Sequence, residues 1–336
     1  ANVQWVVGNA RKMELADIVR ETCDAEPQLI TPALQRDSFT IPVAGIDRRH
    51  TRANLKIQDG CDFFCTFCEI PYARGRARSR VFDDILREAH ELAAAGHREV
   101  VLTGVNIGTY RFAGKTLTDV VDALQEVKGL QRVRISSVEG TTLSPALFER
   151  MGADKKLCRH LHISIQSASD EILTAMRRNY TVAACRALVE ETHDSVAGVC
   201  LGTDVIVGFP GETVDHFRET YENLRDMPFA YFHVFSYSER GHAKSRKLAD
   251  KVPREEIERR SAELRDLSVR KRQLFFAENI GSVQDVLFEQ ERNGYWTGLT
   301  DSYIRVKVRS EKNLKNEFVP VVLQEIDQST MIGKLV

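Results

Sequence analysis

The sequence lacks several features that would assign it to common classes of protein. Its 336 residues carry a formal net charge of only −1, so the chain as a whole gives no electrostatic indication of a nucleic-acid partner. It has no apolar run long enough to cross a bilayer and no secretory signal, so we expect a cytoplasmic protein with no membrane partner. It also has no internal repeat and no low-complexity segment. A hydrophobic content of 43% instead predicts a folded chain with room for two domains.

The most informative residues are three closely spaced cysteines, Cys61, Cys65 and Cys68, in the pattern C-x3-C-x2-C. Three thiolates on one loop can hold three corners of a cubane iron–sulfur cluster. Because no fourth cysteine lies nearby, one iron would stay open to a substrate, which indicates chemistry rather than electron storage. The aromatic residues between the ligands would shield the cluster and tune its potential: these are Phe63, Phe64 and Phe67.

Other roles for the cysteines remain open at this point. A structural zinc site would need a histidine, and the nearest is His50, while the chain has no second C-x2-C pair. A disulfide is disfavoured because seven cysteines are an odd number. Apolar surroundings predict buried free thiols for Cys158, Cys185 and Cys200. For His160 and His162, which alternate on a predicted strand, we expect packing or hydrogen bonding rather than metal binding.

Two basic runs lie on either side of the cysteine motif. Residues 74–80 contain four arginines, and residues 47–52 contain three more. Such runs are often solvated loops. Their position around a cofactor loop would also place positive charge at the mouth of a site, where a phosphate backbone can dock.

The middle of the chain alternates predicted strands and helices. The predicted strands cover residues 55–57, 99–104, 132–138, 160–165, 202–210 and 231–235. The predicted helices between them cover residues 81–95, 117–127, 145–151, 170–176, 182–194 and 214–226. Six β/α units in this order predict an α/β fold with a parallel sheet. Because a full barrel needs eight units, we predict a partial (β/α)6 barrel with its active site at the carboxyl ends of the strands.

The two ends of the chain differ from this middle part. Residues 5–8 predict a strand and residues 10–19 a helix, too little for an independent core. Residues 253–279 predict a long charged helix. The short runs after Gly281 predict four or five strands in a small antiparallel β-barrel, a fold that often binds oligonucleotides. Its seven basic and eight acidic residues balance, so a purely structural packing module remains an alternative.

Several segments together resemble one known family. The stretch from Gly60 to Gly75, continuing to Arg80, is similar to the radical S-adenosylmethionine (SAM) methylthiotransferases. Further similar segments span residues 102–108, 134–139, 160–167, 176–181 and 203–213. The C-terminal part resembles a TRAM domain, which the family uses to bind RNA. The resemblance implies three parts: residues 1–42, the remnant of an N-terminal domain with a linker; residues 47–278, the radical SAM core; and residues 279–336, the TRAM-like β-barrel.

The resemblance also implies a function. Segments 103–108, 160–162 and 176–178 look most like the branch that methylthiolates N6-threonylcarbamoyladenosine at carbon 2, next to the tRNA anticodon. Other branches modify isopentenyladenosine in tRNA or an aspartate of a ribosomal protein. The implied partners are the tRNA anticodon stem-loop and an external electron donor. A non-catalytic iron–sulfur RNA-binding protein is the alternative from another class.

The family mechanism implies a role for each matching residue. The cluster, held by Cys61, Cys65 and Cys68, would bind SAM at its open iron and cleave it to a 5′-deoxyadenosyl radical, which abstracts hydrogen from the adenine. The implied SAM contacts are Thr103 and Gly104 at the amino group, Glu139 at the ribose, Gln166 at the pocket mouth, Arg178 at the carboxylate, and Val207 with the following residues beside the adenine.

The chain departs from the family pattern in two places. Family members carry an N-terminal domain whose own three cysteines hold a second [4Fe-4S] cluster. Here the sequence begins within what resembles the tail of that domain, and Cys23 alone is not expected to hold a cluster. Either the chain is N-terminally truncated or the protein lacks the second cluster, and in both cases we expect one cluster in this chain. Gly140 stands where relatives place proline, so that loop can differ.

Overall fold

The computed structural model describes residues 3–22, 26–47, 49–153 and 156–336. Two residues discussed above lie outside these ranges. They are Cys23, which is not expected to hold a cluster, and Arg48, which belongs to the basic run at residues 47–52. Within them, no helix combines the length and the apolar character that crossing a membrane requires.

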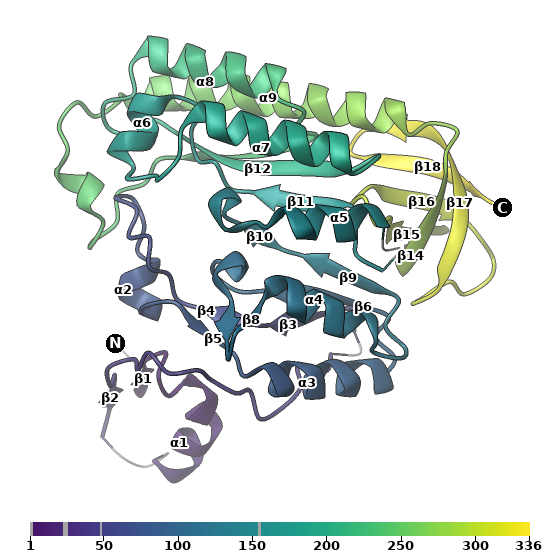
Figure 1. Cartoon of the computed structure of the whole chain (residues 1–336), viewed down its shortest axis with the longest axis horizontal. Coiled ribbons are helices and arrows are strands. Elements are labelled where there is room, and N and C mark those ends of the chain that lie inside the picture. The colour runs from purple at the N-terminus through teal and green to yellow at the C-terminus, as the bar shows by residue number, and fades with distance from the viewer. Residues whose placement is uncertain (1–2, 23–25, 48, 154–155) are drawn as a thin grey trace.

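The centre of the protein is a row of parallel strands covered by helices (Figure 1). One sheet has the order β3-β6-β9 and the next has the order β10-β11-β12-β13. Only Ser136 separates β9 from β10, so these two short strands form one position of a continuous, curved wall. The strands are β3 (Arg52–Lys56), β6 (Glu99–Thr103), β9 (Arg132–Ile135), β10 (Ser137–Val138), β11 (His160–Ile163), β12 (Cys200–Val207) and β13 (Tyr231–Ser236). The predicted partial (β/α)6 barrel is confirmed.

Helices cover the outer face of this wall because the crossover connections between successive parallel strands run over it. They are α3 (Phe82–Ala94), α4 (Leu117–Gln125), α5 (Pro145–Ala153), α6 (Asp170–Ala175), α7 (Val182–Ser195) and α8 (Val214–Asp226). Local signals fix several of their starts: the Thr181 side chain caps α7, and Thr213 begins a capping box on α8. Buried aliphatic side chains of strands and helices form one large core.

Short elements occupy the loops beyond the carboxyl ends of the strands, and the sequence pattern did not predict them. They are β4 (Gln58–Asp59), α2 (Ile70–Arg74), β5 (Arg78–Ser79), η2 (Ile107–Thr109), β7 (Arg111–Phe112), β8 (Lys115–Thr116), η3 (Gly140–Thr142) and η4 (Lys244–Lys247). Each is too short to produce a periodic pattern.

The N-terminal segment forms a small α/β unit of its own. It contains β1 (Trp5–Val7), η1 (Lys12–Glu14), α1 (Leu15–Glu21) and β2 (Gln28–Ile30), with β1 and β2 paired in parallel. The predicted strand is present. The predicted helix at residues 10–19 is wrong in position, because the first turns are 3₁₀ and the α-helix starts at Leu15.

A long helix, α9 (Arg254–Glu278), leads into the C-terminal barrel. The barrel strands are β14 (Val283–Arg292), β15 (Tyr295–Leu299), β16 (Arg305–Arg309), β17 (Phe318–Asp327) and β18 (Thr330–Leu335), closed in the order β14-β15-β16-β18-β17. The predicted small β-barrel is present; four of its five strand pairs are antiparallel, and β16 and β18 are parallel. Strand directions cannot alternate around a closed ring of five, so one neighbouring pair must be parallel.

The small barrel packs against the amino ends of the parallel strands, at the end opposite to α2 (Figure 1). Arg134 of β9 donates to the carbonyl oxygens of Thr300 and Asp301 at 3.0 and 2.9 Å, and Arg159 pairs with the Asp301 carboxylate at 2.6 Å. Tyr303 stacks on His160 with ring centroids 4.3 Å apart. The loop between β15 and β16 therefore closes this end of the partial barrel.

We expect Arg134→Ala to destabilise the protein by about 3–5 kcal/mol, because it leaves the buried Glu99 carboxylate, now 2.7 Å from Arg134 Nε, without this partner. Urea denaturation measures the loss. The control is Arg225→Ala, which removes an exposed arginine paired with Asp226 and should cost less than about 0.5 kcal/mol. Equal effects of the two substitutions would contradict the prediction.

Candidate functional site

A pocket opens at the carboxyl ends of the parallel strands, where the βα loops meet. It brings together the three clustered cysteines and three of the residues predicted to contact SAM. The full lining is Cys61, Phe63, Cys65, Phe67, Cys68, Ile70, Val105, Asn106, Ser137, Val138, Glu139, Ser164, Gln166 and Arg178. Segments more than 100 residues apart in the sequence thus share one cavity.

The cysteine loop is held on both sides by backbone contacts. Cys61 N donates to the Gly75 carbonyl at 3.1 Å, and Thr66 bonds through its backbone and hydroxyl to Met176 and Ala175. Gly60 has φ +71°, and a Cβ there would lie 2.0 Å from the Arg76 carbonyl oxygen. Only glycine therefore allows the chain to turn into the loop at this point.

The three thiols have the chemistry of a cluster site. Each is partly exposed to the pocket, whereas Cys158, Cys185 and Cys200 are buried free thiols, as predicted. Two sulfurs already accept N–H donors: Cys65 Sγ from Arg178 at 3.3 Å and Cys68 Sγ from Ile70 N at 3.4 Å. Such hydrogen bonds stabilise cluster thiolates. Three thiol ligands and no fourth in the lining fit a cluster with one open iron.

The lining does not favour the zinc alternative. A structural zinc site with three sulfurs is most often completed by a histidine or a fourth cysteine. His50 is exposed and its Nδ1 lies 3.0 Å from Asp47, and none of the residues recorded as lining the pocket is a histidine.

Gln58 ties the cysteine loop to the loop after β6, and sequence reasoning missed this residue. Its Oε1 accepts from the backbone N–H groups of Val105 and Asn106, both at 2.9 Å, while its Nε2 donates to the Gly60 carbonyl at 2.8 Å. The side chain is fully buried. A lone glutamine before a cysteine motif carries no pattern that would reveal this role.

Glu139 and Arg178 form a buried pair beside the cysteines. Arg178 Nη2 donates to Glu139 Oε2 and to the Ser164 carbonyl oxygen, the latter at 2.8 Å. Burial raises the pKa of Glu139, and the Arg178 charge opposes that rise. Glu139 Oε1 is buried and has no hydrogen-bond partner among the residues described. A buried acceptor without a donor is costly, so a ligand hydroxyl would satisfy this atom.

Strained backbone also clusters around this pocket. Phe64, Gln166 and Arg177 have φ of 51°, 68° and 59°, in the left-handed region that non-glycine residues avoid. Gln166 is held there by hydrogen bonds of its backbone to Asp204 and Ile206 at 2.9 and 2.8 Å. Such outliers concentrate at functional sites, where the surrounding structure enforces them.

Other predicted site residues lie outside the pocket lining. Thr103 ends β6, and Gly104 packs against Gln58 and Ile107, so the next two residues, Val105 and Asn106, line the cavity instead. Val207 is buried in the core. Phe64, expected to shield the cluster, packs edge-on against Tyr72 and under Arg76. The lining residues that sequence reasoning missed at strand ends include Asn106, Ser137 and Ser164.

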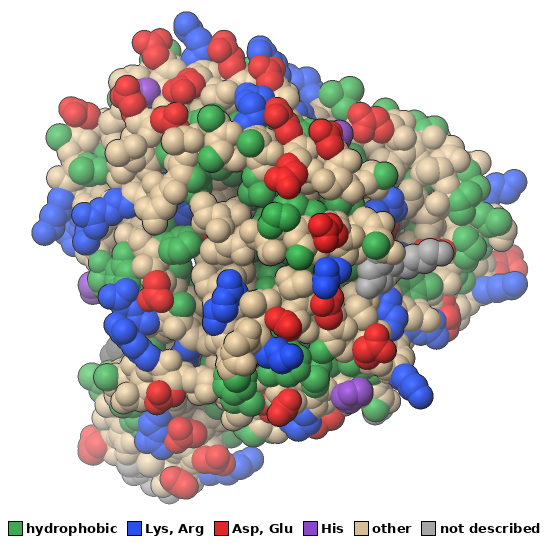
Figure 2. Space-filling view, viewed as in Figure 1, with side chains coloured by type: hydrophobic (Ala, Val, Ile, Leu, Met, Phe, Trp, Pro, Cys, Tyr) green, Lys and Arg blue, Asp and Glu red, His purple; other side chains and the backbone are tan. Residues whose placement is uncertain are grey.

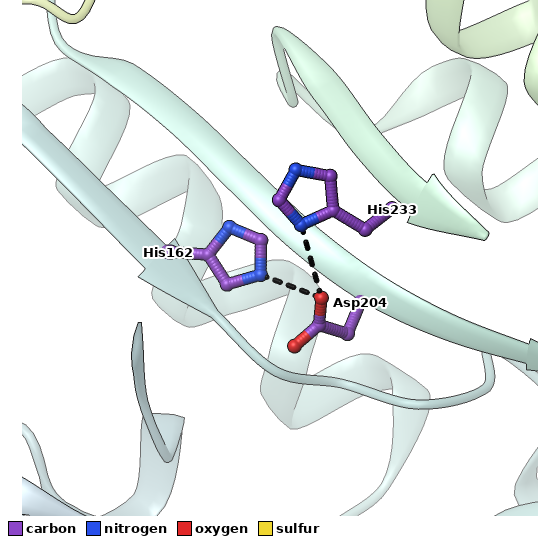
Figure 3. Close-up of side chains that lie close together, drawn as sticks. All are labelled: His162, Asp204 and His233. Atoms are coloured by element: carbon purple, nitrogen blue, oxygen red, sulfur yellow. Dashed lines mark ion pairs between the residues drawn. The ribbon is translucent and has the colours of Figure 1, made fainter. Parts of the chain in front are cut away.

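A polar network continues from the pocket along β11, β12 and β13. Ser164 donates to Asp204 Oδ2 at 2.9 Å, and two ring nitrogens, His162 Nε2 and His233 Nδ1, lie 2.9 and 3.3 Å from Asp204 Oδ1 (Figure 3). Burial raises the pKa of Asp204, but the neighbouring His162, His233 and Ser164 side chains outweigh it and hold this pKa below its usual value.

The same three groups lie close enough together to hold a metal ion. Both imidazoles, however, approach a single carboxylate oxygen (Figure 3), and Tyr231 OH lies 2.9 Å from His160 Nε2 and 3.2 Å from His162 Nδ1. Both imidazoles hydrogen-bond to the Tyr231 hydroxyl, while His162 Nε2 has no hydrogen-bond partner among the residues described. The contacts thus favour the predicted hydrogen-bonding role of His160 and His162.

The four arginines of the basic run at residues 74–80 have different roles. Arg80 is fully buried and pairs with Asp84 at 2.6 Å and with Glu88, so it supports the fold. Arg76 pairs with Asp62 at 3.3 Å. Arg74 and Arg78 both pair with the carboxylate of Asp59.

We expect Gln58→Leu to loosen the cysteine loop, because it leaves the N–H groups of Val105 and Asn106 unpaired at a cost of about 1–3 kcal/mol each. Iron retained per chain after anaerobic reconstitution and desalting should fall. The control is Gln131→Leu, at an exposed glutamine before β9. Undiminished iron retention in Gln58→Leu would contradict a bridging role.

Comparison with known proteins agrees with this geometry. Residues 55–224 match the family described as the Radical SAM superfamily. The chain is 35% identical over 319 residues to the threonylcarbamoyladenosine tRNA methylthiotransferase MtaB of Aquifex aeolicus, covering 93% of this chain and 76% of that protein. It is 36% identical over 282 residues to MtaB of Bacillus subtilis, covering 81% of this chain and 62% of that protein.

A relative with another name is about as similar. The tRNA-2-methylthio-N(6)-dimethylallyladenosine synthase of Syntrophomonas wolfei is 37% identical over 344 residues, which covers 99% of this chain and 76% of that protein. Among solved structures, the radical S-adenosylmethionine methyltransferase TsrM from Kitasatospora setae shares the fold, with a TM-score of 0.52 and 17% identity over 68% of this chain and 50% of that one. The chain therefore belongs to the radical SAM methylthiotransferase family of enzymes.

Proposed function

We propose that this protein methylthiolates carbon 2 of N6-threonylcarbamoyladenosine in the anticodon stem-loop of a tRNA, using SAM and one [4Fe-4S] cluster. The observation that carries the proposal is the pocket in which the three thiols meet the buried Glu139–Arg178 pair. An external electron donor would supply reducing equivalents, and a tRNA substrate is consistent with action in the cytoplasm. We propose the three parts that the resemblance implies: residues 1–42 as the remnant of an N-terminal domain with a linker, residues 47–278 as the radical SAM core, and residues 279–336 as the TRAM-like β-barrel.

Each side chain would have a distinct task. Cys61, Cys65 and Cys68 would hold the cluster, which together with SAM supplies the 5′-deoxyadenosyl radical. Glu139 Oε1 has a free acceptor position for a ribose hydroxyl. Arg178, already a donor to Cys65 and Glu139, would orient the SAM carboxylate.

We propose that the other residues predicted to contact SAM act in two ways, directly or through the shape of the pocket. Gln166 lines the pocket and would contact SAM directly. Thr103, Gly104 and Val207 lie outside the lining and would act through the backbone and packing that shape it.

The polar network favours threonylcarbamoyladenosine over isopentenyladenosine as substrate. His233 has a side chain 52% exposed, and His162 and Asp204 lie next to it. A threonylcarbamoyl group can hydrogen-bond to such groups, whereas an apolar isopentenyl chain would bury polar atoms without partners. The names of the relatives support both tRNA substrates.

The first test is anaerobic reconstitution with iron and sulfide, followed by iron counting and an assay for 5′-deoxyadenosine from SAM and dithionite. We expect about four irons per chain and release of 5′-deoxyadenosine. Cys65→Ala should abolish both, while Cys185→Ala, a buried thiol on α7, should retain both. A cluster that leaves SAM intact would favour the alternative, a non-catalytic RNA-binding protein.

The substrate is tested separately, with tRNA carrying either threonylcarbamoyladenosine or isopentenyladenosine. Mass spectrometry of the digested nucleosides should detect the 2-methylthio product from the former alone. Because the discrimination depends on lost hydrogen bonds, we expect kcat/KM to differ by about 10⁴-fold or more. A product from isopentenyladenosine at a similar rate would reassign the branch, and a product from neither would redirect attention to a protein substrate.

A further inference from the structure

Four cations converge on one carboxylate beside the cysteine loop. Asp59 lies 2.7 Å from Lys56, 3.2 Å from Arg74, 3.3 Å from Lys12 and 3.4 Å from Arg78. We call Lys12, Lys56, Arg74 and Arg78 the Asp59 cation cluster. Its members come from η1, β3, α2 and β5, so the tertiary structure, and not one basic run, assembles it.

The positive charge of this cluster exceeds what its own carboxylate can balance. Asp59 contributes one negative charge against four positive charges. For the described part of the chain, Asp59 is the only carboxylate recorded as pairing with any of the four cations. Lys56 alone, at 2.7 Å, already pairs with Asp59, so balancing this carboxylate does not account for the other three cations.

The Asp59 cation cluster is held in place by neighbouring side chains and is partly exposed to solvent. The Phe39 ring lies 5.7 Å from Lys56 Nζ and 5.3 Å from the Arg78 guanidinium, which limits the movement of both cations. Lys12 and Arg74 are more than one-third exposed. These two could therefore reach an anion outside the protein while Lys56 and Arg78 hold Asp59.

A second basic group lies on another side of the same loop. Lys244, Arg246 and Lys247 of η4 are exposed, and no carboxylate is recorded within ion-pair distance of them among the residues described. Ser245 N donates to the Thr66 carbonyl at 2.9 Å, which attaches η4 directly to the cysteine loop. Figure 2 shows Lys and Arg side chains gathered along the left edge, where Figure 1 places α2.

We propose that the Asp59 cation cluster and the η4 cations bind backbone phosphates of the tRNA on two sides of the pocket. The ligand chemistry is a phosphodiester anion, which lysine and arginine recognise without reading sequence. Contacts on both sides of the pocket would position one nucleotide over the cysteine loop. This inference rests on the proposed function because it assigns the surface that the tRNA substrate would occupy.

The test measures tRNA affinity as a function of salt for the reconstituted full chain. Each phosphate-binding cation that is removed should reduce the slope of log K against log salt by about one. Lys12→Gln with Arg74→Gln should therefore lower the slope by about two, as should Lys244→Gln with Lys247→Gln, and the four together by about four. The control, Arg225→Gln with Arg254→Gln, changes two exposed arginines on α8 and at the start of α9 and should leave the slope unchanged.

The outcomes separate this inference from the proposed function. Iron per chain and melting temperature report whether each variant is folded. Failure of the wild-type chain to bind tRNA would overturn the proposed function. Wild-type binding with the same slope in both pairs of variants would overturn this inference alone. Displacement of tRNA by inorganic phosphate at constant ionic strength, lost in the variants, would indicate a free-phosphate site and overturn the assignment to the tRNA backbone.

Discussion

The common direction of the parallel strands is the constraint on which the rest of the structure depends. Because β3, β6, β9/β10, β11, β12 and β13 all run the same way, their carboxyl ends meet at one edge. Cysteines after β3, Glu139 after β10 and Arg178 after α6 therefore share one pocket. Helices on the outside keep the strands in this order, so packing far from the pocket maintains its geometry.

Around the pocket lie one set of neutral hydrogen bonds and one charged pair, and the two have different roles. Gln58 joins two loops through a neutral amide whose bonds to Val105, Asn106 and Gly60 need no particular pH. The Glu139–Arg178 pair is charged and buried, and Glu139 Oε1 has no hydrogen-bond donor among the residues described. The first arrangement positions the cysteine loop, and the second places a buried ion pair beside it.

One end of the partial barrel is closed by the C-terminal barrel, and the other end is open. The C-terminal barrel closes the amino ends of the strands through arginine contacts and the Tyr303–His160 stack. The carboxyl ends remain open and carry the unbalanced cations around Asp59 and on η4. An RNA that contacted both the small barrel and the pocket would have to extend along the length of the partial barrel.

Local sequence determined much of this protein. The C-x3-C-x2-C spacing, the six alternating units and the strand-rich C-terminus predicted the cysteine loop, the partial barrel and the small barrel, because each depends on patterns of neighbouring residues. Helix α8 matches its predicted bounds because the Thr213 capping box marks its start. The family resemblance pointed to Glu139, Gln166 and Arg178 before the structure brought them to the pocket lining.

Only the tertiary structure decided the contacts between distant segments. The sequence patterns assigned no role to Gln58, Ser164 or Lys12, and their partners lie in other loops or strands. The four arginines of residues 74–80 look alike in sequence, yet burial makes Arg80 structural while Arg74 stays partly exposed. The parallel β16–β18 pair follows from closing five strands into a ring, a condition that no single strand contains.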